Sequence, residues 1–203
     1  MTVAIIKYNA GNVQSVLYAL QRLGTNAIVT DEVDEITSAD KVIFPGVGNA
    51  ASAMEYLKEK KLDELIVSLK QPVLGICLGL QLLCKSSEEG NTECLGIFDT
   101  VVKKFDDNVF QNKNLVPFKI PHMGWNTITG LSSPLMNGVP ENSFVYFVHS
   151  YYAELSSETI ASTDYITSFS AAIHRNNFYG VQFHTEKSGV TGERILSNFL
   201  NIE

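Results

Sequence analysis

The fold of this chain is indicated most clearly by residues 72–85, which read PVLGICLGLQLLCK. The apolar run 72–76 is typical of a buried strand, and the run 78–85 that follows it is typical of a helix. A strand that turns at once into a helix at Cys77 has the layout of a nucleophile elbow, in which flanking glycines leave room for the backbone. We expect this cysteine to point outward over the first N–H groups of the helix, which would favour a thiolate and later an oxyanion.

Strand-like and helix-like segments alternate through the first half of the chain. Strands are expected at residues 3–7, 26–30, 41–44 and 72–76, and helical patterns at 13–20, 50–58 and 62–69. Strands separated by helices of this length predict a parallel sheet covered on both faces. The strand at 41–44 is expected to end at Pro45-Gly46-Val47-Gly48. Since parallel strands end at one edge of a sheet, this loop should lie beside Cys77, and its glycines permit a peptide flip.

The second half of the chain has a different pattern. Short aromatic or β-branched segments predict strands at residues 100–105, 125–129, 144–152, 159–163, 168–174 and 178–183. We expect these strands to form hairpins that extend the sheet, before a closing helix at 192–200. The tripeptide Asp106-Asp107-Asn108 suggests a turn, and residues 106–118 carry no other readable pattern. The whole chain, 1–203, is expected to be a single α/β domain with a mostly parallel central sheet and an antiparallel extension.

Composition and charge argue against several classes of function. The 203 residues are 45% hydrophobic and 18% charged, the net charge is −7, and the densest basic stretch is only Lys58-Glu59-Lys60-Lys61. A surface for nucleic acid or anionic membrane would need more positive charge. No apolar run approaches the roughly 20 residues that span a bilayer. The chain starts with a strand pattern rather than a basic leader, and three cysteines fit reduced thiols, so we expect a cytoplasmic protein.

A histidine and a carboxylate near the other end of the chain are candidates to complete a site with Cys77. The tripeptide His184-Thr185-Glu186 follows an apolar run. A lone histidine beside Phe183 is more often a core residue. Here Glu186 can bend back to hold the imidazole Nδ1–H, which leaves the other nitrogen for the thiol. Cysteine, histidine and carboxylate are the three parts of an activated-thiol site.

Cysteines and histidines also have simpler interpretations. A cysteine among apolar residues is often just a small buried side chain, which is what we expect of Cys84 and Cys94. For Cys77 the flanking Gly75 and Gly79 favour a reactive role, because a core cysteine would not need them. No metal site is expected, since there is no C-x-x-C pair and metal-ligand spacing is lacking around the other histidines, His122, His149 and His174.

Three motifs in this order resemble those of class I (triad-type) glutamine amidotransferases over the whole chain. They are PGVG at 45–48, GICLGLQ at 75–81 and HTE at 184–186. The resemblance implies a flavodoxin-like three-layer sandwich that hydrolyses L-glutamine through a cysteine thioester, without a metal or organic cofactor. It implies that Cys77 is the nucleophile, His184 the base and Glu186 the residue that orients the base.

The same resemblance implies the other roles in the site. The backbone N–H groups of Val47, after a peptide flip, and of Leu78 would form the oxyanion hole. Glu89 would bind the α-ammonium group of the substrate, although a solvated acidic loop is the simpler interpretation of that segment. The residues that line the glutamine pocket would be Gly48, Gln81, Glu89, His149, Ser150 and Tyr151.

Finer motifs narrow the resemblance. Gly11-Asn12, PHMGWN at 121–126, FVHSYY at 147–152 and Lys187-Ser188 are similar to motifs in the family of glutaminase subunits of imidazole glycerol phosphate synthase. The resemblance implies a heterodimer with a (β/α)₈-barrel cyclase subunit, which would receive ammonia for histidine biosynthesis. The residues that would face this partner are Asn12, Met123, Trp125 and Lys187.

Other functions share parts of this pattern. A paralogous amidotransferase subunit that supplies ammonia for surface-sugar amidation would keep the triad, and the motif at 121–126 separates it poorly from the histidine-pathway family. A cysteine hydrolase of the same fold would typically lack the histidine–x–glutamate ending. A binding module that has lost its activity would not need all three of Cys77, His184 and Glu186.

Overall fold

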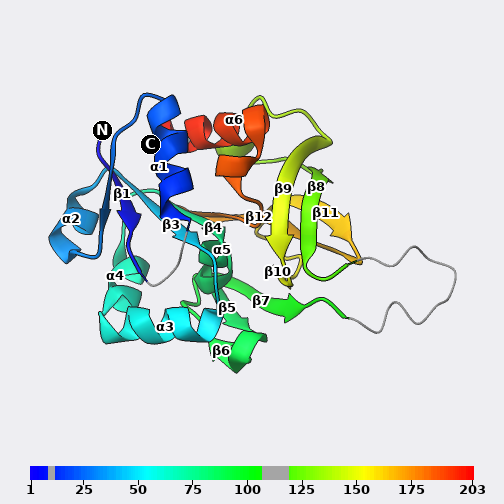
Figure 1. The fold of residues 1–203 in the computed structure, drawn as a ribbon, viewed down its shortest axis with the longest axis horizontal. Helices are drawn as coiled ribbons and strands as arrows, with labels where there is room; N and C mark the ends of the chain where they lie inside the picture. The colour runs from blue at the N-terminus through cyan, green and yellow to red at the C-terminus, as the bar shows by residue number, and fades with distance from the viewer. Residues whose placement is uncertain (9–11, 107–118) are drawn as a thin grey trace, which may run out of the picture.

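A seven-stranded sheet forms the centre of the molecule (Figure 1). The structure, a computed structural model, describes residues 1–8, 12–106 and 119–203. Five strands are parallel and lie in the order β2-β1-β3-β4-β13, and β12 and β11 continue the sheet antiparallel beyond β13. The strands of this sheet are β1 (Val3–Ile6), β2 (Ala27–Thr30), β3 (Lys41–Gly46), β4 (Val73–Cys77), β11 (Thr159–Tyr165), β12 (Thr167–Arg175) and β13 (Phe178–Val181).

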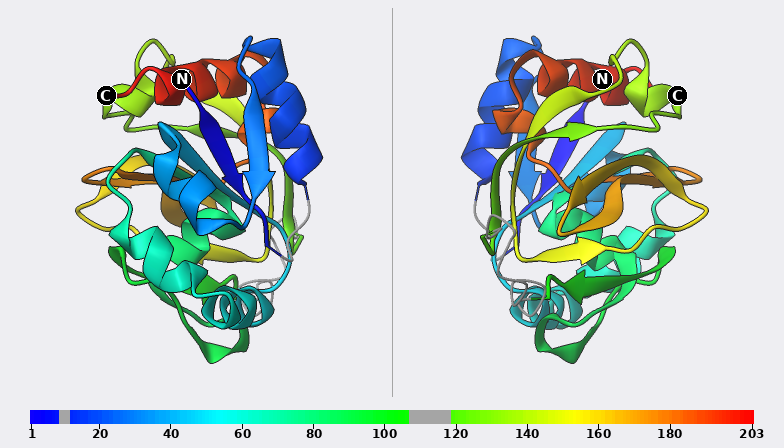
Figure 2. Two further views of the ribbon diagram at one scale, coloured as in Figure 1. Left: turned by 90° about the vertical axis from the view of Figure 1, so that its left-hand side faces the viewer. Right: turned by 90° about the vertical axis from the view of Figure 1, so that its right-hand side faces the viewer.

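Helices cover both faces of this sheet, as the two side views in Figure 2 show. Along the strands, successive apolar side chains point to opposite faces, so that Ile43 and Phe44 belong to two different cores. One core packs under α1 (Val13–Arg22) and α6 (Gly189–Leu200). The other packs under α2 (Val33–Ser38), α3 (Ala50–Glu59), α4 (Leu62–Ser68) and α5 (Leu78–Leu83).

The strand order β2-β1-β3-β4-β13 is the flavodoxin-like order of a doubly wound sheet. The expected α/β class, the mostly parallel sheet and its antiparallel extension are therefore confirmed. No helix among the described residues is long and apolar enough to cross a membrane.

The hairpins of the second half are only partly as predicted. The antiparallel pairs β11–β12 and β12–β13 do extend the central sheet, but the strands predicted at 100–105, 125–129 and 144–152 pair outside it, because strand patterns do not specify their pairing partners. A two-stranded sheet contains β8 (His122–Ile128) and β9 (Ser143–His149). A four-stranded sheet contains β5 (Cys84–Ser87), β6 (Thr92–Glu93), β7 (Phe98–Lys104) and β10 (Tyr151–Ala153).

Some predicted boundaries are also wrong. The helix after the elbow ends at Leu83 rather than Lys85, because residues 84–87 pair with β7 as strand β5. The predicted strand at 144–152 is divided into β9 and β10, and α2 was not predicted. Short 3₁₀ helices occur at η1 (Glu89–Asn91), η3 (Pro134–Met136) and η4 (Thr185–Lys187). Gly11 and most of the turn suggested at 106–108 lie outside the described residues.

Gly79 allows α5 to pack directly on β3. A Cβ atom at this position would lie 1.8 Å from the carbonyl oxygen of Phe44, which is backbone and cannot move away cheaply. Gly75 is similarly crowded, because its Cβ would lie 2.8 Å from the backbone of Gly79. The glycines that flank Cys77 are therefore required by a close approach of the helix to the sheet.

We predict that Gly79→Ala destabilises the fold by about 3 kcal/mol or more, because overpacking here displaces backbone. Gly24→Ala is the matched control: its φ is +71° and no atom lies within 4 Å of the added Cβ. It should cost only the left-handed backbone term of about 1–2 kcal/mol. Urea unfolding of both variants would measure the difference. Equal losses of stability would contradict the close-packing explanation.

Candidate active site

The register of three neighbouring strands brings the predicted motifs to one edge of the sheet. In the β3–β4 pair Gly46 lies opposite Cys77, and in the β4–β13 pair Val181 lies opposite Ile76. The residues that follow β13 therefore come out beside Cys77. In parallel sheets ligands bind beyond the carboxyl ends of the strands, because the residues that follow several strands meet there.

Cys77 occupies the sharp turn between β4 and α5. Its backbone has φ 53° and ψ −108°, a conformation that is costly for a residue with a side chain. Its sulfur lies 3.9 Å from the carbonyl oxygen of Val148 and 3.7 Å from Nε2 of Gln182. The elbow predicted from residues 72–85 is present, and it aims the thiol towards β9 and the end of β13.

His184 and Glu186 form a buried pair next to this thiol. His184 Nδ1 donates to Glu186 Oε1 at 2.7 Å, and both side chains are inaccessible to solvent. The same carboxylate oxygen accepts a hydrogen bond from the amide of Asn12, which was predicted only as a partner-facing residue. Because Nδ1 carries the proton that Glu186 accepts, Nε2 is the nitrogen available to the thiol. No described residue makes a hydrogen bond to that Nε2.

The charge state of His184 follows from its neighbours. Burial by itself lowers the pKa of the imidazole, but interaction with the Cys77 thiol and with the Glu186 carboxylate outweighs burial and raises this pKa to about 10. At neutral pH the imidazole therefore carries a proton. An imidazolium beside a thiol favours the thiolate, which is the nucleophilic form of cysteine.

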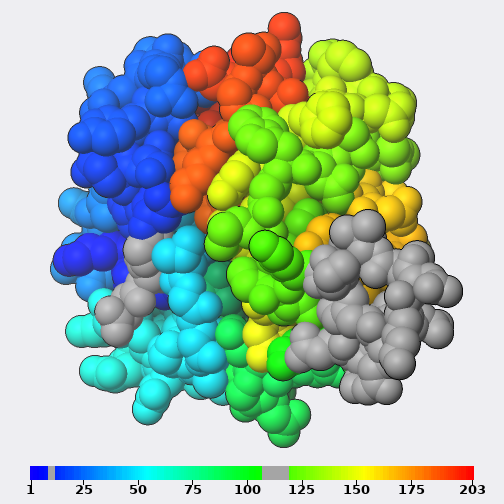
Figure 3. Space-filling view, turned by 45° about the vertical axis from the view of Figure 1, so that its right-hand side comes forward, coloured from blue at the N-terminus to red at the C-terminus, as the bar shows by residue number. Residues whose placement is uncertain are grey.

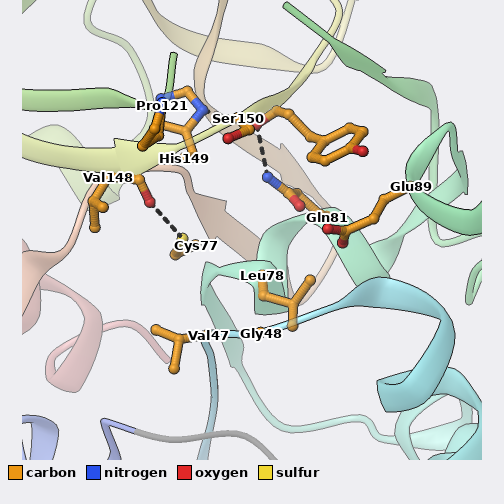
Figure 4. A pocket seen from close by; sticks show the side chains of 11 residues that line it. Val47, Gly48, Cys77, Leu78, Gln81, Glu89, Pro121, Val148, His149 and Ser150 are labelled. Atoms are coloured by element: carbon orange, nitrogen blue, oxygen red, sulfur yellow. Dashed lines mark hydrogen bonds between the residues drawn. The ribbon is translucent and has the colours of Figure 1, made fainter. Parts of the chain in front are cut away.

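A cavity of about 310 Å³ opens over Cys77 (Figure 4). It is lined by every residue predicted for the oxyanion hole and the glutamine pocket, and also by Pro121 and Val148, which were not predicted. His184 and Glu186 are not among its lining residues. The predicted residues that line the cavity are Val47, Gly48, Cys77, Leu78, Gln81, Glu89, His149, Ser150 and Tyr151.

Glu89 and Gln81 supply the polar groups at one end of the cavity. One carboxylate oxygen of Glu89 accepts from the N–H of Ala50 at 2.7 Å, which leaves the other oxygen for a ligand. Gln81 Nε2 donates to the carbonyl oxygen of Tyr151 at 2.8 Å and to Oε1 of Gln182 at 3.0 Å. Since Nε2 makes these bonds, the carbonyl oxygen of the Gln81 amide is free to accept.

Two neutral histidines support the opposite wall. His149 Nδ1 donates to the carbonyl oxygen of Tyr151 at 2.7 Å, so its Nε2 accepts from Nδ1 of His122 at 3.1 Å. Burial lowers the pKa of His122 to about 4. Burial is the largest of the causes that lower the pKa of His149 to about 3, and the neighbouring His122 is the next. Both imidazoles therefore act as neutral hydrogen-bonding groups near pH 7.

The sequence analysis missed Gln182 and His122. Gln182 is fully buried and contacts both Cys77 and Gln81. One signal for it was available, because Gln182 is a polar residue within the apolar run 178–183 that leads to His184. His122 could be found only from its pairing with His149 across β8 and β9.

Of the residues predicted to face a partner, Met123, Trp125 and Lys187 are exposed, whereas Asn12 is partly buried against Glu186. Met123 and Trp125, on β8, are 63% and 54% exposed. Lys187 is exposed, with its Nζ 6.0 Å from the centre of the Tyr146 ring. Figure 3 shows that the green surface of β8, the orange surface that follows β13 and the cyan surface that follows β3 lie next to one another. Among the described residues no cluster of His, Cys, Asp and Glu is arranged to hold a metal ion.

Comparison with known proteins assigns the chain to a family. The model of the family described as "Glutamine amidotransferase class-I" matches residues 4–202. The chain belongs to the class I glutamine amidotransferases. Among the curated relatives of this amidotransferase, the "Imidazole glycerol phosphate synthase subunit HisH" of Bacteroides fragilis is 58% identical over 202 residues. The protein of the same description from Bacteroides thetaiotaomicron is 56% identical, and each match covers all of both chains.

Solved structures support the same fold. A putative GMP synthase protein from Thermoplasma acidophilum aligns with a TM-score of 0.73 at 20% identity, covering 98% of the amidotransferase chain and 92% of its own. A chain in the structure of PurLQS from Thermotoga maritima aligns with a TM-score of 0.66 at 14% identity, covering 98% and 97%. These similarities and the family match confirm the fold class and the resemblance to class I glutamine amidotransferases.

We predict that the buried pair of neutral histidines makes the amidotransferase sensitive to acid. Unfolded histidines bind a proton below about pH 6.5. In the folded protein His122 has a pKa of about 4 and His149 a pKa of about 3, so both stay neutral until the pH falls that low. Their contribution to stability is therefore complete above pH 6.5 and is lost as the pH falls towards 4. Each adds a slope of up to about 1.4 kcal/mol per pH unit.

Urea unfolding of the wild type and of His122→Phe between pH 7 and 4.5 tests this prediction. Phenylalanine can keep the stacking of His122 on Tyr165 and Phe147 but cannot titrate. The variant should lose stability less steeply with falling pH. Parallel curves for the two proteins would show that His122 is not the source of the acid sensitivity.

Proposed function

We propose that this chain is the glutaminase subunit of an imidazole glycerol phosphate synthase. It hydrolyses L-glutamine to glutamate and ammonia, and passes the ammonia to a (β/α)₈-barrel cyclase subunit in histidine biosynthesis. The observation that carries the proposal is the buried His184–Glu186 pair that interacts with Cys77, the cysteine that lines a cavity of about 310 Å³. The identity of 56–58% to HisH subunits over the whole chain favours this synthase.

In the proposed reaction the Cys77 thiolate attacks the γ-carboxamide carbon of glutamine. The negative charge that develops on oxygen is met by the N–H of Leu78 at the start of α5 and, after a peptide flip, by the N–H of Val47. Each such donor can lower the barrier by about 3–4 kcal/mol. These N–H groups lie on the two segments that flank the thiol, after β3 and after β4.

The His184 imidazolium then gives its Nε2 proton to the departing ammonia, and the carbon–nitrogen bond breaks to leave a thioester. The neutral imidazole next takes a proton from water, whose oxygen attacks the thioester and releases glutamate. Glu186 keeps Nδ1–H in place throughout, and Asn12 holds the same carboxylate oxygen. Asn12 thus has a role in the site in addition to its proposed position at the partner interface.

The cavity offers complementary groups to a glutamine molecule. The free oxygen of Glu89 suits the α-ammonium group, and the Gln81 carbonyl oxygen accepts an N–H of the substrate. Gly48 and the segment His149-Ser150-Tyr151 provide the remaining walls. His149 is held by His122 and by the Tyr151 carbonyl, which fixes this segment before substrate binds.

The ammonia product needs a protected route to its acceptor, because in neutral water it would mostly become ammonium, which is not a nucleophile. The β8–β9 face is suited to dock the barrel that would receive it. Across this hairpin Trp125 pairs with Tyr146, and Met123 and Trp125 are more than half exposed. Phe144, near the start of β9, is 59% exposed and extends the apolar surface. Lys187 lies beside the Tyr146 ring.

Amidation of a surface sugar by a paralogous subunit remains the competing function for the same site. The HisH relatives favour the histidine pathway. Rescue of growth without histidine in a strain that lacks this subunit would distinguish the two. We also propose a cytoplasmic location, because Cys77, Cys84 and Cys94 are all free thiols.

We predict that Cys77→Ser lowers glutamine-dependent turnover of the complex by more than about 10³-fold, because it removes the nucleophile. Ammonia-dependent turnover of the same complex should survive. Cys94→Ala, which changes a buried thiol outside the cavity, is the matched control and should retain both activities. Steady-state assays with glutamine and with ammonium chloride measure the two rates. Loss of both activities in Cys77→Ser would indicate a structural role for Cys77.

We predict that Trp125→Ala weakens binding of the barrel subunit by about 30-fold, the loss typical of a central aromatic contact. The stability of the isolated chain should hardly change, because Trp125 is 54% exposed. Val67→Ala, on the exposed side of α4, is the control and should bind the barrel normally. Titration calorimetry of the two purified proteins measures the affinity. An unchanged affinity for Trp125→Ala would place the interface elsewhere.

A further inference from the structure

Gln182 is a fully buried polar side chain next to the nucleophile, and the reaction proposed above gives it no role. It follows β13, and the parallel register of β13 with β4 brings it beside Cys77. Its Nε2 lies 3.7 Å from the Cys77 sulfur, and its Oε1 accepts from Gln81 at 3.0 Å. Burying an amide is costly unless its groups are paired, so both contacts matter to the site.

The orientation of this amide is fixed by a chain of hydrogen bonds that starts at the cavity wall. The carbonyl oxygen of Tyr151 can only accept, so the Gln81 group that faces it must be the NH₂ group. The same nitrogen faces Gln182, which must therefore present its oxygen to Gln81. That leaves the NH₂ group of Gln182, a donor, facing the Cys77 sulfur.

We propose that Gln182 is a positioning residue for Cys77, whose amide N–H holds the sulfur and stabilises the thiolate, and that the relay from Tyr151 through Gln81 keeps this donor aimed. The catalytic consequence rests on the proposed glutaminase function. A hydrogen bond from a neutral donor to an ionised acceptor is stronger than one between two neutral groups. The contact therefore strengthens as the thiol loses its proton.

A neutral donor suits this position better than a basic side chain. His184 already supplies one positive charge beside the thiolate. A second cation with no exposure to solvent would lack a negative charge of its own, because the single charge of Glu186 already balances the His184 imidazolium. An amide stabilises the sulfur without that desolvation cost and without competing for the proton that His184 delivers.

The test compares Gln182→Met with a matched control. Methionine has a similar length but lacks the donor and the acceptor. The control is Ser170→Ala, in the neighbouring strand β12. Ser170 is also fully buried, and its hydroxyl group bonds Thr159 and the carbonyl oxygen of Glu154, away from the cavity. Both variants lose a buried hydrogen-bonding group, so they separate loss of stability from loss of the contact with sulfur.

The main measurement is the rate of alkylation of Cys77 by iodoacetamide against pH, followed by mass spectrometry on the full chain. Gln182→Met should move the midpoint of this profile upward by about one pH unit or more and slow alkylation by about 10-fold or more at pH values below the wild-type midpoint. Ser170→Ala should keep the wild-type profile. In the complex, the kcat for glutamine should fall by a similar factor in Gln182→Met, with a smaller change in KM.

A second variant keeps the proposal testable if Gln182→Met does not fold. Gln81→Leu leaves Gln182 in place but removes the contact that orients it. Iodoacetamide does not need the glutamine pocket, so the alkylation profile of this variant reports on the relay alone. It should move in the same direction by a smaller amount. Wild-type profiles in every folded variant at either position would overturn the proposal.

The outcomes also separate this inference from the proposed function. If the wild-type complex does not hydrolyse glutamine, the glutaminase assignment fails, yet the alkylation profiles still decide whether Gln182 acts on the Cys77 thiolate. If the complex hydrolyses glutamine and the profiles do not move, only the role given to Gln182 is wrong.

Discussion

The side-by-side endings of β3, β4 and β13 are the constraint on which the site depends. Parallel pairing holds Gly46 level with Cys77 and brings the residues after Val181 to the other side of the same cysteine. Residues separated by more than a hundred positions along the chain thereby meet at one sheet edge. A slip of one residue in either pairing would turn the side chains of the slipped strand to the opposite face and separate the thiol from the His184–Glu186 pair.

The packing around this edge explains the unusual backbone at Cys77. Its φ of 53° costs free energy that the rest of the fold must supply. The packing of α5 against β3 and β4 offsets this cost. The contact is so close that neither Gly75 nor Gly79 has room for a Cβ atom. The buried leucines of α5 add apolar contacts on the same side of the sheet. The backbone conformation of Cys77 and the close approach of α5 to the sheet therefore depend on each other.

Local patterns in the sequence predicted the parts of the structure that local chemistry controls. The strand, turn and helix around Cys77 come from an apolar run, two glycines and a second apolar run that adjoin one another. Segments 84–87 and 122–128 were harder, because their structure is set by distant partners, β7 and β9. The contacts of Gln182 and the bond from Asn12 to Glu186 depend on side chains from separate strands and loops meeting in the folded chain.

The histidines of the site show how the same side chain acquires opposite charge states a short distance apart. Burial lowers the pKa of His149, and its hydrogen bonds to a carbonyl oxygen and to another imidazole do not reverse that effect. His184 is equally hidden from solvent, but a carboxylate and a thiol face its two nitrogens and reverse it. Because the His149 imidazole in the cavity wall is neutral, the charge beside Cys77 comes from the His184–Glu186 pair. The uncharged amide of Gln182 adds a dipole to this environment, since its Nε2 lies 3.7 Å from the Cys77 sulfur, and the effect of a dipole depends on where it points.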